Sequence, residues 1–311
     1  MSGISPARPL RAFRLYWSMV RYGRAHNRDF AREHFAFFDE MRRRLAGYVG
    51  ELAGLRVLDV GCGKSMWLTL LLQSAGAQVT GIDTEAVTAL RGLRKYNSIV
   101  KNNGVERALR TVAWDILFAR PYYKHLEEAC GFPLLFEGLD VRRMSAQELD
   151  FDDDTFDLVV SHEVFEHLPD LDATVESIQR VMKPTGITYI YTHNYASISG
   201  GHHIAWKYPD SEPSETVPPW DHLRENRFPD IPSWLNRLRE RDYREAFGKS
   251  FDIAEWLHTT REGEKLLTPD IQAELAEFSA DELLTKGFVT IARPRKVGAA
   301  LLNAAEESHG A

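Results

Sequence analysis

Short apolar runs alternate with amphipathic segments along most of the chain. The first run, residues 57–60 (VLDV), is short and β-branched enough for a buried parallel strand. The amphipathic segment from Met66 to Ser74, with Gly76 as a stop signal, predicts a helix. A second apolar run from Gln78 to Ile82 predicts another buried strand that finishes on Asp83. These elements together predict a β-α-β unit.

The same alternation continues downstream. Further strands are expected at Pro133–Leu139, Phe156–Val160, Ile187–Thr192, Phe251–Leu257 and Gly287–Arg293. Helical segments are expected at 84–103, 105–119, 121–129, 163–168 and Thr268–Ala280. A further helix is expected to end at Met182, before a turn at 183–186. Strands that alternate with helices are typical of an α/β fold with a mostly parallel sheet.

Other segments lie outside this alternation. Residues 1–50 carry recurrent arginines and aromatic residues and predict a helical extension of two amphipathic helices. Insertions at about 104–132 and 193–245 interrupt the α/β domain, expected at 51–295, and are predicted to form a two-part lid, since insertions over a rigid sheet often set specificity. Residues 296–311 are predicted to be a flexible tail.

Composition narrows the class of protein. The chain is 44% hydrophobic and 27% charged, as is usual for soluble globular proteins. Its two cysteines form no disulfide framework, which fits a cytoplasmic location, and a net charge of -7 argues against nucleic acid as a partner. No apolar run is long enough to span a membrane, and the first residues lack the apolar core of a signal peptide. The basic first helix either packs on the core or contacts anionic lipid weakly.

The turn after the first strand points to a ligand. Gly61 and Gly63 allow the backbone to turn sharply and approach a ligand closely. Asp83, at the end of the second strand, can accept hydrogen bonds from both hydroxyls of a ribose. A dinucleotide site would have a third glycine where this chain has Met66.

Three stretches together resemble the S-adenosylmethionine motifs of class I methyltransferases. They are VLDVGCG…GID, DFDDDTFDLVVSHEVFEHLPD and IQRVMKPTGITYI, and the resemblance covers about Leu55 to Thr192 without the helical insertion. It implies a Rossmann-like, seven-stranded, mostly parallel sheet with helices on both faces, and S-adenosylmethionine as the cofactor. The GGHH and PWDHL stretches of the second insertion are similar to uncharacterised bacterial small-molecule methyltransferases. These motifs say little about the substrate.

The resemblance also implies which residues hold the cofactor. They are Asp59, Gly61, Cys62, Gly63, Asp83, Ser161 and His162. Two alternatives stay open for the adenine. Counting back from Leu149 leads to Ser145 and Ala146, whereas Asp140 is expected at the end of the third strand.

Histidines and acids gather in segments that follow the strands, where open α/β sheets bind ligands. His193 follows the fifth strand and is predicted to be the general base, near its ordinary pKa of about 6.5. His162 and Glu163 are further catalytic candidates, although Glu163, Glu166 and His167 also have an interpretation as residues that start a helix. The histidines predicted to contact the acceptor are His167, His202, His203 and His222.

A metal held by His202, His203 and the Asp221-His222 pair is an alternative, but adjacent histidines often point apart, so no metal is predicted.

Taken together, the motifs predict a methyltransferase that modifies a hydroxyl of a small or carrier-linked metabolite, such as a sugar or natural product. Carbon or nitrogen acceptors remain alternatives. So does a regulatory protein that binds S-adenosylmethionine without turnover. The segment SHEVFEH lacks the D/N-P-P-Y tetrapeptide of enzymes that methylate amino groups of bases. The acceptor and the oligomeric state are not determined by the sequence.

Overall fold

The computed structural model describes residues 7–85, 115–227 and 234–296, together with residues 97, 100, 105 and 112; of residues 7–25, 116 and 117 it describes the backbone alone. The chain forms two compact units. The first comprises Met1–Gly54, Cys62–Thr80 and Glu85–Arg142, and the second comprises Leu55–Gly61, Gly81–Thr84 and Arg143–Ala311. Most of the helix expected at 84–103, much of that at 105–119, and the tail from 297 lie outside the described residues. The predicted domain boundaries stay a prediction.

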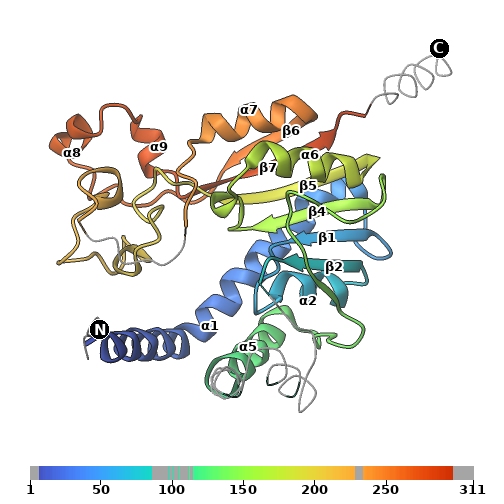
Figure 1. Ribbon diagram of the computed structural model, residues 1–311, viewed down its shortest axis with the longest axis horizontal. Coiled ribbons are helices and arrows are strands. Elements are labelled where there is room, and N and C mark those ends of the chain that lie inside the picture. The colour runs from blue at the N-terminus through green and yellow to red at the C-terminus, as the bar shows by residue number, and fades with distance from the viewer. Residues whose placement is uncertain are drawn as a thin grey trace, which may run out of the picture. The chain divides into compact units, whose positions relative to one another are not determined.

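Seven strands form one sheet in the order β3-β2-β1-β4-β5-β7-β6 (Figure 1). They are β1 (Arg56–Val60), β2 (Gln78–Asp83), β3 (Asp140–Arg143), β4 (Phe156–His162), β5 (Met182–His193), β6 (Phe251–His258) and β7 (Gly287–Pro294). β4 pairs in parallel with both β1 and β5, whereas β7 is antiparallel to β5 and β6. The predicted seven-stranded, mostly parallel α/β sheet is confirmed.

The prediction of the third strand was wrong. Pro133–Leu139 is a loop, and β3 begins at Asp140. Leu135 is 50% exposed and Gly138 has a φ of +76°, so this apolar run turns across the surface and is not a buried strand. The Gln73 side chain donates to the carbonyls of Leu135 and Glu137, both at 2.9 Å, and thereby meets the hydrogen-bonding needs of the loop.

The fifth strand is longer than predicted. β5 already pairs with β4 at Met182, but the partner of Phe156 is Met182 and that of Leu158 is Ile187. Most of the segment expected as a turn, 183–186, therefore forms an irregularity inside β5. It does not form a turn before the strand.

Two helices cover one face of the sheet in the second unit. α6 (Leu171–Val181) begins at Asp170, whose side chain accepts from the Ala173 amide. α7 (Glu240–Ser250) was not predicted and lies partly in the expected second insertion. Figure 1 shows both helices on the same side of the strands. One apolar core joins them to the sheet, and its members include Leu58, Val60, Val159, Val175, Ile178, Ile190 and Phe247.

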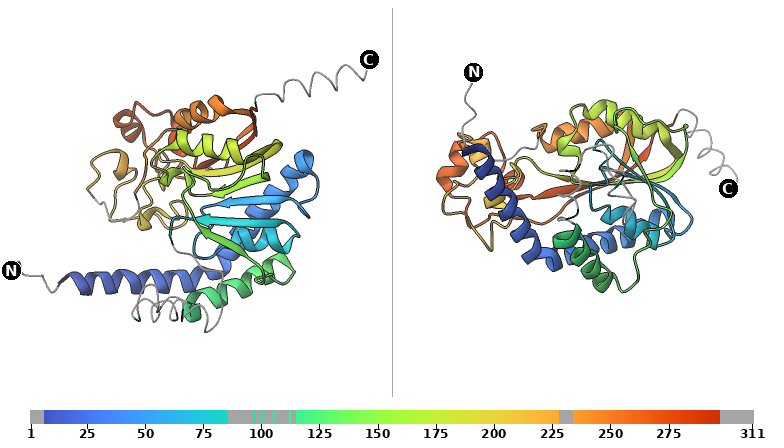
Figure 2. Two further views of the ribbon diagram at one scale, coloured as in Figure 1. Left: turned by 45° about the vertical axis from the view of Figure 1, so that its right-hand side comes forward. Right: turned by 60° about the horizontal axis from the view of Figure 1, so that its bottom comes forward.

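The second insertion shares a small apolar core with residues from later in the chain. It contains two short 3-10 turns, η3 (Ile204–Trp206) and η4 (Asp221–Leu223). The single helix expected at Thr268–Ala280 is replaced by α8 (Pro269–Glu274) and α9 (Ala280–Leu284). These pieces lie side by side in Figures 1 and 2 and share the buried residues Ile198, Trp206, Val217, Trp220, Leu275, Leu283 and Leu284. The insertion is therefore a packed lobe.

The first unit is helical outside its strand residues. It contains α1 (Ala7–Val49), α2 (Trp67–Ser74) and α5 (Arg120–Cys130), with a π-helical turn, η1 (Asp115–Ala119), before α5. α1 is one continuous helix where two were predicted, because Gly23 alone costs only about 1 kcal/mol in a helix interior. The predicted lipid contact concerns mainly side chains of residues 7–25, which lie outside the description.

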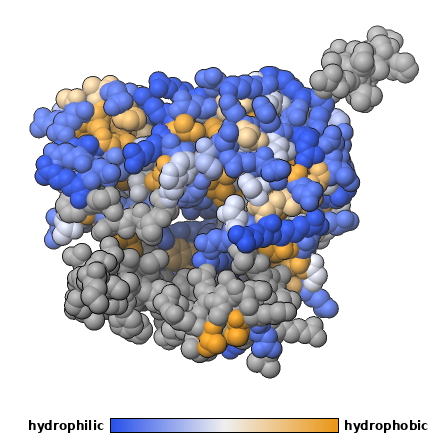
Figure 3. All heavy atoms as spheres, in the orientation of Figure 1, coloured by the Kyte–Doolittle hydropathy of each residue, from blue (hydrophilic) through white to orange (hydrophobic). Residues whose placement is uncertain are grey.

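In Figure 3 hydrophilic side chains dominate the coloured part of the visible face, and hydrophobic ones occur in small groups. Among the helices that the structure describes, none is both long and apolar enough to cross a bilayer.

Candidate active site

A glycine turn ties the carboxyl ends of three strands together. Gly61 follows β1 with a φ of +76°, and its amide donates to the Ile82 carbonyl at 2.8 Å. A Cβ at Gly61 would lie 2.3 Å from Cγ2 of Val164, so a side chain does not fit there. The Ser161 hydroxyl donates to the Val60 carbonyl at 2.9 Å and links β4 to the same turn. The Ser161 side chain therefore hydrogen-bonds to the backbone next to the predicted ligand position.

The other predicted cofactor residues of the second unit lie along this edge. Asp59 is buried in β1, and Asp83 is half-buried at the end of β2. The Met144 amide donates to the Asp83 carbonyl at 3.0 Å, which brings Ser145 to the same edge. Ala146 is only 6% exposed and its side chain belongs to the apolar core, so it offers no side-chain contact to a ligand.

Three predicted cofactor residues belong to the first unit. Cys62 is buried, and Gly63 has a φ of +60°. Asp140 is the first residue of β3, so the prediction that it ends the strand was wrong. Its carboxylate pairs with Arg142 at 2.7 Å and accepts from the Thr80 hydroxyl at 3.0 Å. The hydrogen bond from Arg142 is the main reason that the pKa of Asp140 lies below its usual value.

Aromatic side chains hold the start of α2 within the first unit. The His34 ring of α1 stacks on Trp67, with centroids 4.2 Å apart, and its Nδ1 lies 2.6 Å from the Tyr122 hydroxyl. The Tyr123 hydroxyl donates to the Ser65 carbonyl at 2.9 Å. α1 and α5 therefore support the loop that leads from the glycine turn into α2.

His193 ends β5 and is part of a buried chain of hydrogen bonds. Its Nε2 lies 2.8 Å from the Ser199 hydroxyl, which donates to Glu262 at 2.6 Å. The Ser199 amide donates to the same carboxylate oxygen at 2.9 Å. Because the single hydroxyl hydrogen of Ser199 points to Glu262, His193 must donate its Nε2 hydrogen to Ser199. The lone pair of His193 is therefore on Nδ1.

Burial changes the predicted protonation of His193. Desolvation is the largest influence and lowers the pKa of His193 to about 3, although Glu163 acts in the opposite direction. The expectation of a pKa near 6.5 was wrong, because the ring is only 8% exposed at the end of β5. His193 is accordingly neutral, with an available lone pair, throughout the physiological pH range.

Glu163 is the ionised group of this region. It follows β4 with a φ of +55°, an unusual conformation for a residue other than glycine. Desolvation acts to raise its pKa, but His162, His193 and the other nearby basic side chains together lower the pKa to about 2. The neighbouring His162 ring lies 4.9 Å from that of Tyr191, and burial lowers its pKa.

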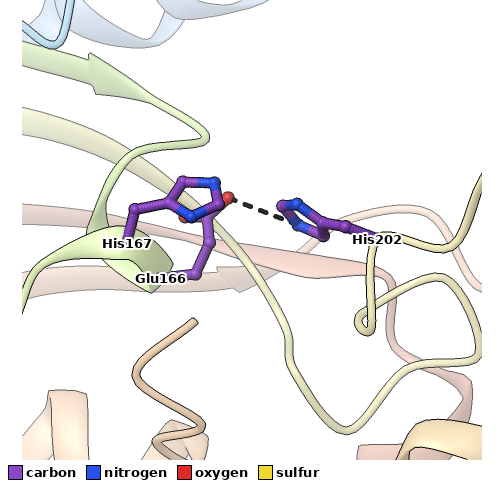
Figure 4. Close-up of side chains that lie close together, drawn as sticks. All are labelled: Glu166, His167 and His202. Atoms are coloured by element: carbon purple, nitrogen blue, oxygen red, sulfur yellow. Dashed lines mark ion pairs between the residues drawn. The ribbon is translucent and has the colours of Figure 1, made fainter. Parts of the chain in front are cut away.

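Glu166, His167 and His202 come together beyond Glu163 (Figure 4). Glu166 and His167 belong to a 3-10 turn, η2 (Phe165–His167), and His202 belongs to the loop after β5. Glu166 Oε1 and His202 Nε2 lie 3.9 Å apart, and the rings of His167 and His202 meet edge to face at 5.0 Å. Burial is the main reason that the pKa of Glu166 lies well above its usual value.

The remaining predicted histidines have structural partners. His203 Nδ1 accepts from the Ala205 amide at 3.0 Å and caps η3. His222 Nε2 donates to the Tyr195 carbonyl at 2.8 Å. A Cβ at Gly201 would lie 2.5 Å from Cγ of His222, so the glycine pair in this loop lets His222 pack closely.

Two residues of the hydrogen-bond chain were missed from the sequence. Ser199 directly precedes the GGHH stretch and was a reasonable candidate because of that position. Glu262 lies outside every recognised motif, in the connection between β6 and α8, and only the packing of the insertion reveals it. Sequence spacing gave no signal for this residue.

The strand order, the glycine turn and the acid at the end of β2 agree with the class I methyltransferase fold. The sequence model of the family described as "Methyltransferase domain" matches residues 30–251. The chain belongs to this family of S-adenosylmethionine-dependent methyltransferases.

Curated relatives match part of the chain. A mitochondrial ubiquinone biosynthesis O-methyltransferase of Bos taurus is 30% identical over 149 residues, which cover 48% of this chain and 31% of the relative. A ubiquinone biosynthesis O-methyltransferase of Rhizobium rhizogenes is 29% identical and covers 55% and 51%. A sterol 24-C-methyltransferase of Gibberella zeae is 26% identical and covers 55% and 34%. The chain thus spans between about a third and a half of the length of these relatives.

Two solved structures match most of the chain at low sequence identity. A putative S-adenosylmethionine-dependent methyltransferase of Listeria monocytogenes has a TM-score of 0.47 and 14% identity, with 82% of this chain and 97% of the other covered. A methyltransferase of Mesorhizobium loti has a TM-score of 0.46 and 18% identity, with coverages of 81% and 96%.

Proposed function

We propose that this chain transfers the methyl group of S-adenosylmethionine to a hydroxyl oxygen of a small metabolite, with His193 as the general base. The observation that supports this proposal is the buried chain from Glu262 through Ser199 to His193. It holds the ring in the tautomer whose Nδ1 can take a proton.

The residues at the sheet edge suit the cofactor. Gly61 allows the sharp backbone turn after β1 where Val164 leaves no room for a side chain, and Asp83 has the position from which an acid accepts hydrogen bonds from a ribose. Ser145 adds a polar side chain at the end of β3. When bound, S-adenosylmethionine supplies a methyl group on a sulfonium, and the carbon–sulfur bond breaks as an acceptor oxygen attacks that methyl carbon.

His193 and its neighbours handle the proton that the acceptor loses. The neutral ring takes this proton on Nδ1 while its Nε2 hydrogen stays bonded to Ser199. Glu163 is ionised and acts on His193 electrostatically, so it stabilises the imidazolium that forms. General base catalysis contributes about 10²–10⁴-fold to a rate when the pKa of the base is near the working pH. With its pKa lowered to about 3, His193 is a weak base and contributes at the low end of this range. Holding the acceptor close to the methyl group supplies the rest.

The relatives agree with a small-molecule acceptor. Two of them are named for O-methylation in ubiquinone biosynthesis, and one is named for C-methylation of a sterol. A positioned base favours an oxygen acceptor, because a hydroxyl must lose its proton during transfer. The predicted carrier-linked acceptors, such as sugars or natural products, remain within this proposal.

The test uses S-adenosylmethionine with a ¹³C-labelled methyl group and panels of phenols, sugars and hydroxy acids. We expect labelled O-methyl products, identified by NMR and mass spectrometry. His193→Gln keeps a donor for Ser199 but removes the base, so turnover should fall by about 10²-fold with cofactor affinity unchanged. His258→Gln, at an exposed histidine paired with Glu240, is the matched control.

The outcomes separate the two parts of the proposal. Label found only on carbon or nitrogen, or no transfer to any acceptor class, contradicts O-methylation. Label on oxygen with His193→Gln within a few fold of wild type shows that positioning alone carries the transfer, and the assignment of the base is then wrong.

A further inference from the structure

We propose that Glu166, His167 and His202 form a binding site for a divalent transition-metal ion such as Zn²⁺. Each residue offers one ligand atom, and these atoms all lie within 4.8 Å of one another (Figure 4). Two of the residues lie in the short η2 turn, and the third comes from the loop after β5. The site therefore joins two segments that are far apart in the sequence.

Polar atoms at this point are buried without partners. Glu166 is 1% exposed, and although the backbone amides of Glu166 and His193 lie near its carboxyl group, neither oxygen makes a hydrogen bond of ordinary geometry. Nε2 of His202 is also buried without a hydrogen-bond partner. Buried polar groups are normally hydrogen-bonded, because desolvation is otherwise uncompensated. A cation between Glu166 and His202 would satisfy both residues at once.

The tautomer of His167 suits a metal ligand. Its Nδ1 lies 2.8 Å from the Trp234 carbonyl, and because a carbonyl only accepts, Nδ1 must carry the hydrogen. The lone pair of His167 is therefore on Nε2. Histidines that bind metals usually donate their other ring nitrogen to a carbonyl or carboxylate in this way, which fixes the orientation of the ring.

The backbone of His202 also has an unusual conformation. Its φ is +56°, in the left-handed region that residues other than glycine seldom occupy. Strained backbone of this kind often occurs at functional sites, where the surrounding structure maintains it. Gly200 and Gly201 precede His202, and the packing of His222 against Gly201 holds the loop in place.

The donor set indicates the kind of ion. Two imidazole nitrogens and one carboxylate oxygen suit Zn²⁺ and similar transition metals, whereas Mg²⁺ and Ca²⁺ prefer oxygen ligands. Bonds of about 2.0–2.2 Å place tetrahedral ligands roughly 3.3–3.6 Å apart, so Glu166 and His202, now 3.9 Å apart, need only a small closure. The three ligand atoms lie within 4.8 Å of one another, so the set as a whole closes by about 1 Å at most when the ion binds. Three protein ligands leave a fourth position for water or for an oxygen of a substrate.

This metal site differs from the alternative that the sequence offers. No metal was predicted, and the alternative set was His202, His203 and His222. In the structure His222 donates Nε2 to Tyr195, and His203 uses Nδ1 to cap η3. The partners of His202 are instead Glu166 and His167, which the sequence analysis had assigned to the fold and to the acceptor, respectively.

The test measures metal binding directly, on the full chain stripped with a chelator. Titration calorimetry with Zn²⁺ should show one ion per chain, and Co²⁺ should give the visible absorption of a tetrahedral site. Glu166→Gln and His202→Ala should each weaken Zn²⁺ binding by at least about 100-fold, since each removes a direct ligand. His203→Ala and His258→Ala should stay within threefold of wild type.

Each other result overturns the proposal. Wild type without a stoichiometric Zn²⁺ site, or equal binding by wild type and His202→Ala, shows that the cluster holds no ion. Loss of binding in His203→Ala with His202→Ala unaffected would place the ion elsewhere. Should Glu166→Gln fold poorly, His202→Ala still decides, because His202 lies in a loop and circular dichroism can confirm its fold. Neither S-adenosylmethionine nor an acceptor is needed, so this result is separate from that on methyl transfer.

Discussion

Gly61 offers a test of the packing of Val164 against the turn after β1. Gly61→Ala places a methyl group 2.3 Å from Cγ2 and 2.8 Å from Cγ1 of Val164, on a backbone with a φ of +76°. The left-handed conformation costs an alanine about 1–2 kcal/mol, and the overlap with Val164 adds roughly 1–3 kcal/mol. We therefore expect the free energy of unfolding to fall by about 2–5 kcal/mol.

Gly138 is a matched control for this change. Its φ is also +76°, but nothing lies within 4 Å of an added Cβ, so Gly138→Ala isolates the cost of the backbone conformation. Urea denaturation of the two variants and of the double variant Gly61→Ala/Val164→Ala measures how much unfolding free energy is lost through the contact with Val164. The double variant should recover part of the loss, because both Cγ atoms are removed. Equal destabilisation of Gly61→Ala and Gly138→Ala would refute the argument that Val164 excludes a side chain from the turn.

Two further predictions concern the insertion. Burial is the main reason that the pKa of His222 falls from 6.5 to about 4. Below pH 6.5 the histidine therefore takes up a proton more readily in the unfolded chain than in the folded protein. The free energy of unfolding consequently decreases as the pH is lowered, by about 2 kcal/mol at pH 5. His222→Gln keeps a donor for Tyr195 but cannot titrate, so its loss of stability between pH 7.5 and 5 should be about 2 kcal/mol smaller, and an equal loss in denaturation curves would contradict this. Ser199→Ala removes the hydrogen bonds that link His193 to Glu262, so turnover should fall about 10- to 100-fold with the affinity for S-adenosylmethionine unchanged. Turnover equal to that of wild type would contradict a role for these hydrogen bonds.

The sequence predicted the sheet because its strands carry a clear signal. Residues 57–60 and Phe156–Val160 are short, apolar and β-branched, and turn residues bound them on both sides. The prediction of the third strand was wrong for the opposite reason. Pro133–Leu139 is apolar but loops over the surface, whereas β3 is a polar edge strand, DVRR, that composition does not reveal.

The site was predictable where it depends on local motifs. The glycine turn and Asp83 follow directly from β1 and β2, and His193 follows from the end of β5. The tautomer of His193 depends on Glu262, which reaches Ser199 only because residues around α8 and α9 pack on the insertion. Its low pKa likewise depends on burial by residues distant in the sequence. Such tertiary contacts have no periodic pattern that a single sequence can show.

Calorimetric titration with S-adenosylmethionine tests the central claim most directly. Asp83 ends β2 at the proposed cofactor edge, whereas Asp140 begins β3 and pairs with Arg142. Wild type should bind S-adenosylmethionine, and Asp83→Ala should weaken binding at least tenfold, since loss of a hydrogen bond to a charged group costs about 1.5–3 kcal/mol. Asp140→Ala should leave the affinity within threefold of wild type. Equal affinity in Asp83→Ala, or a preference of the wild type for NAD, would contradict the account.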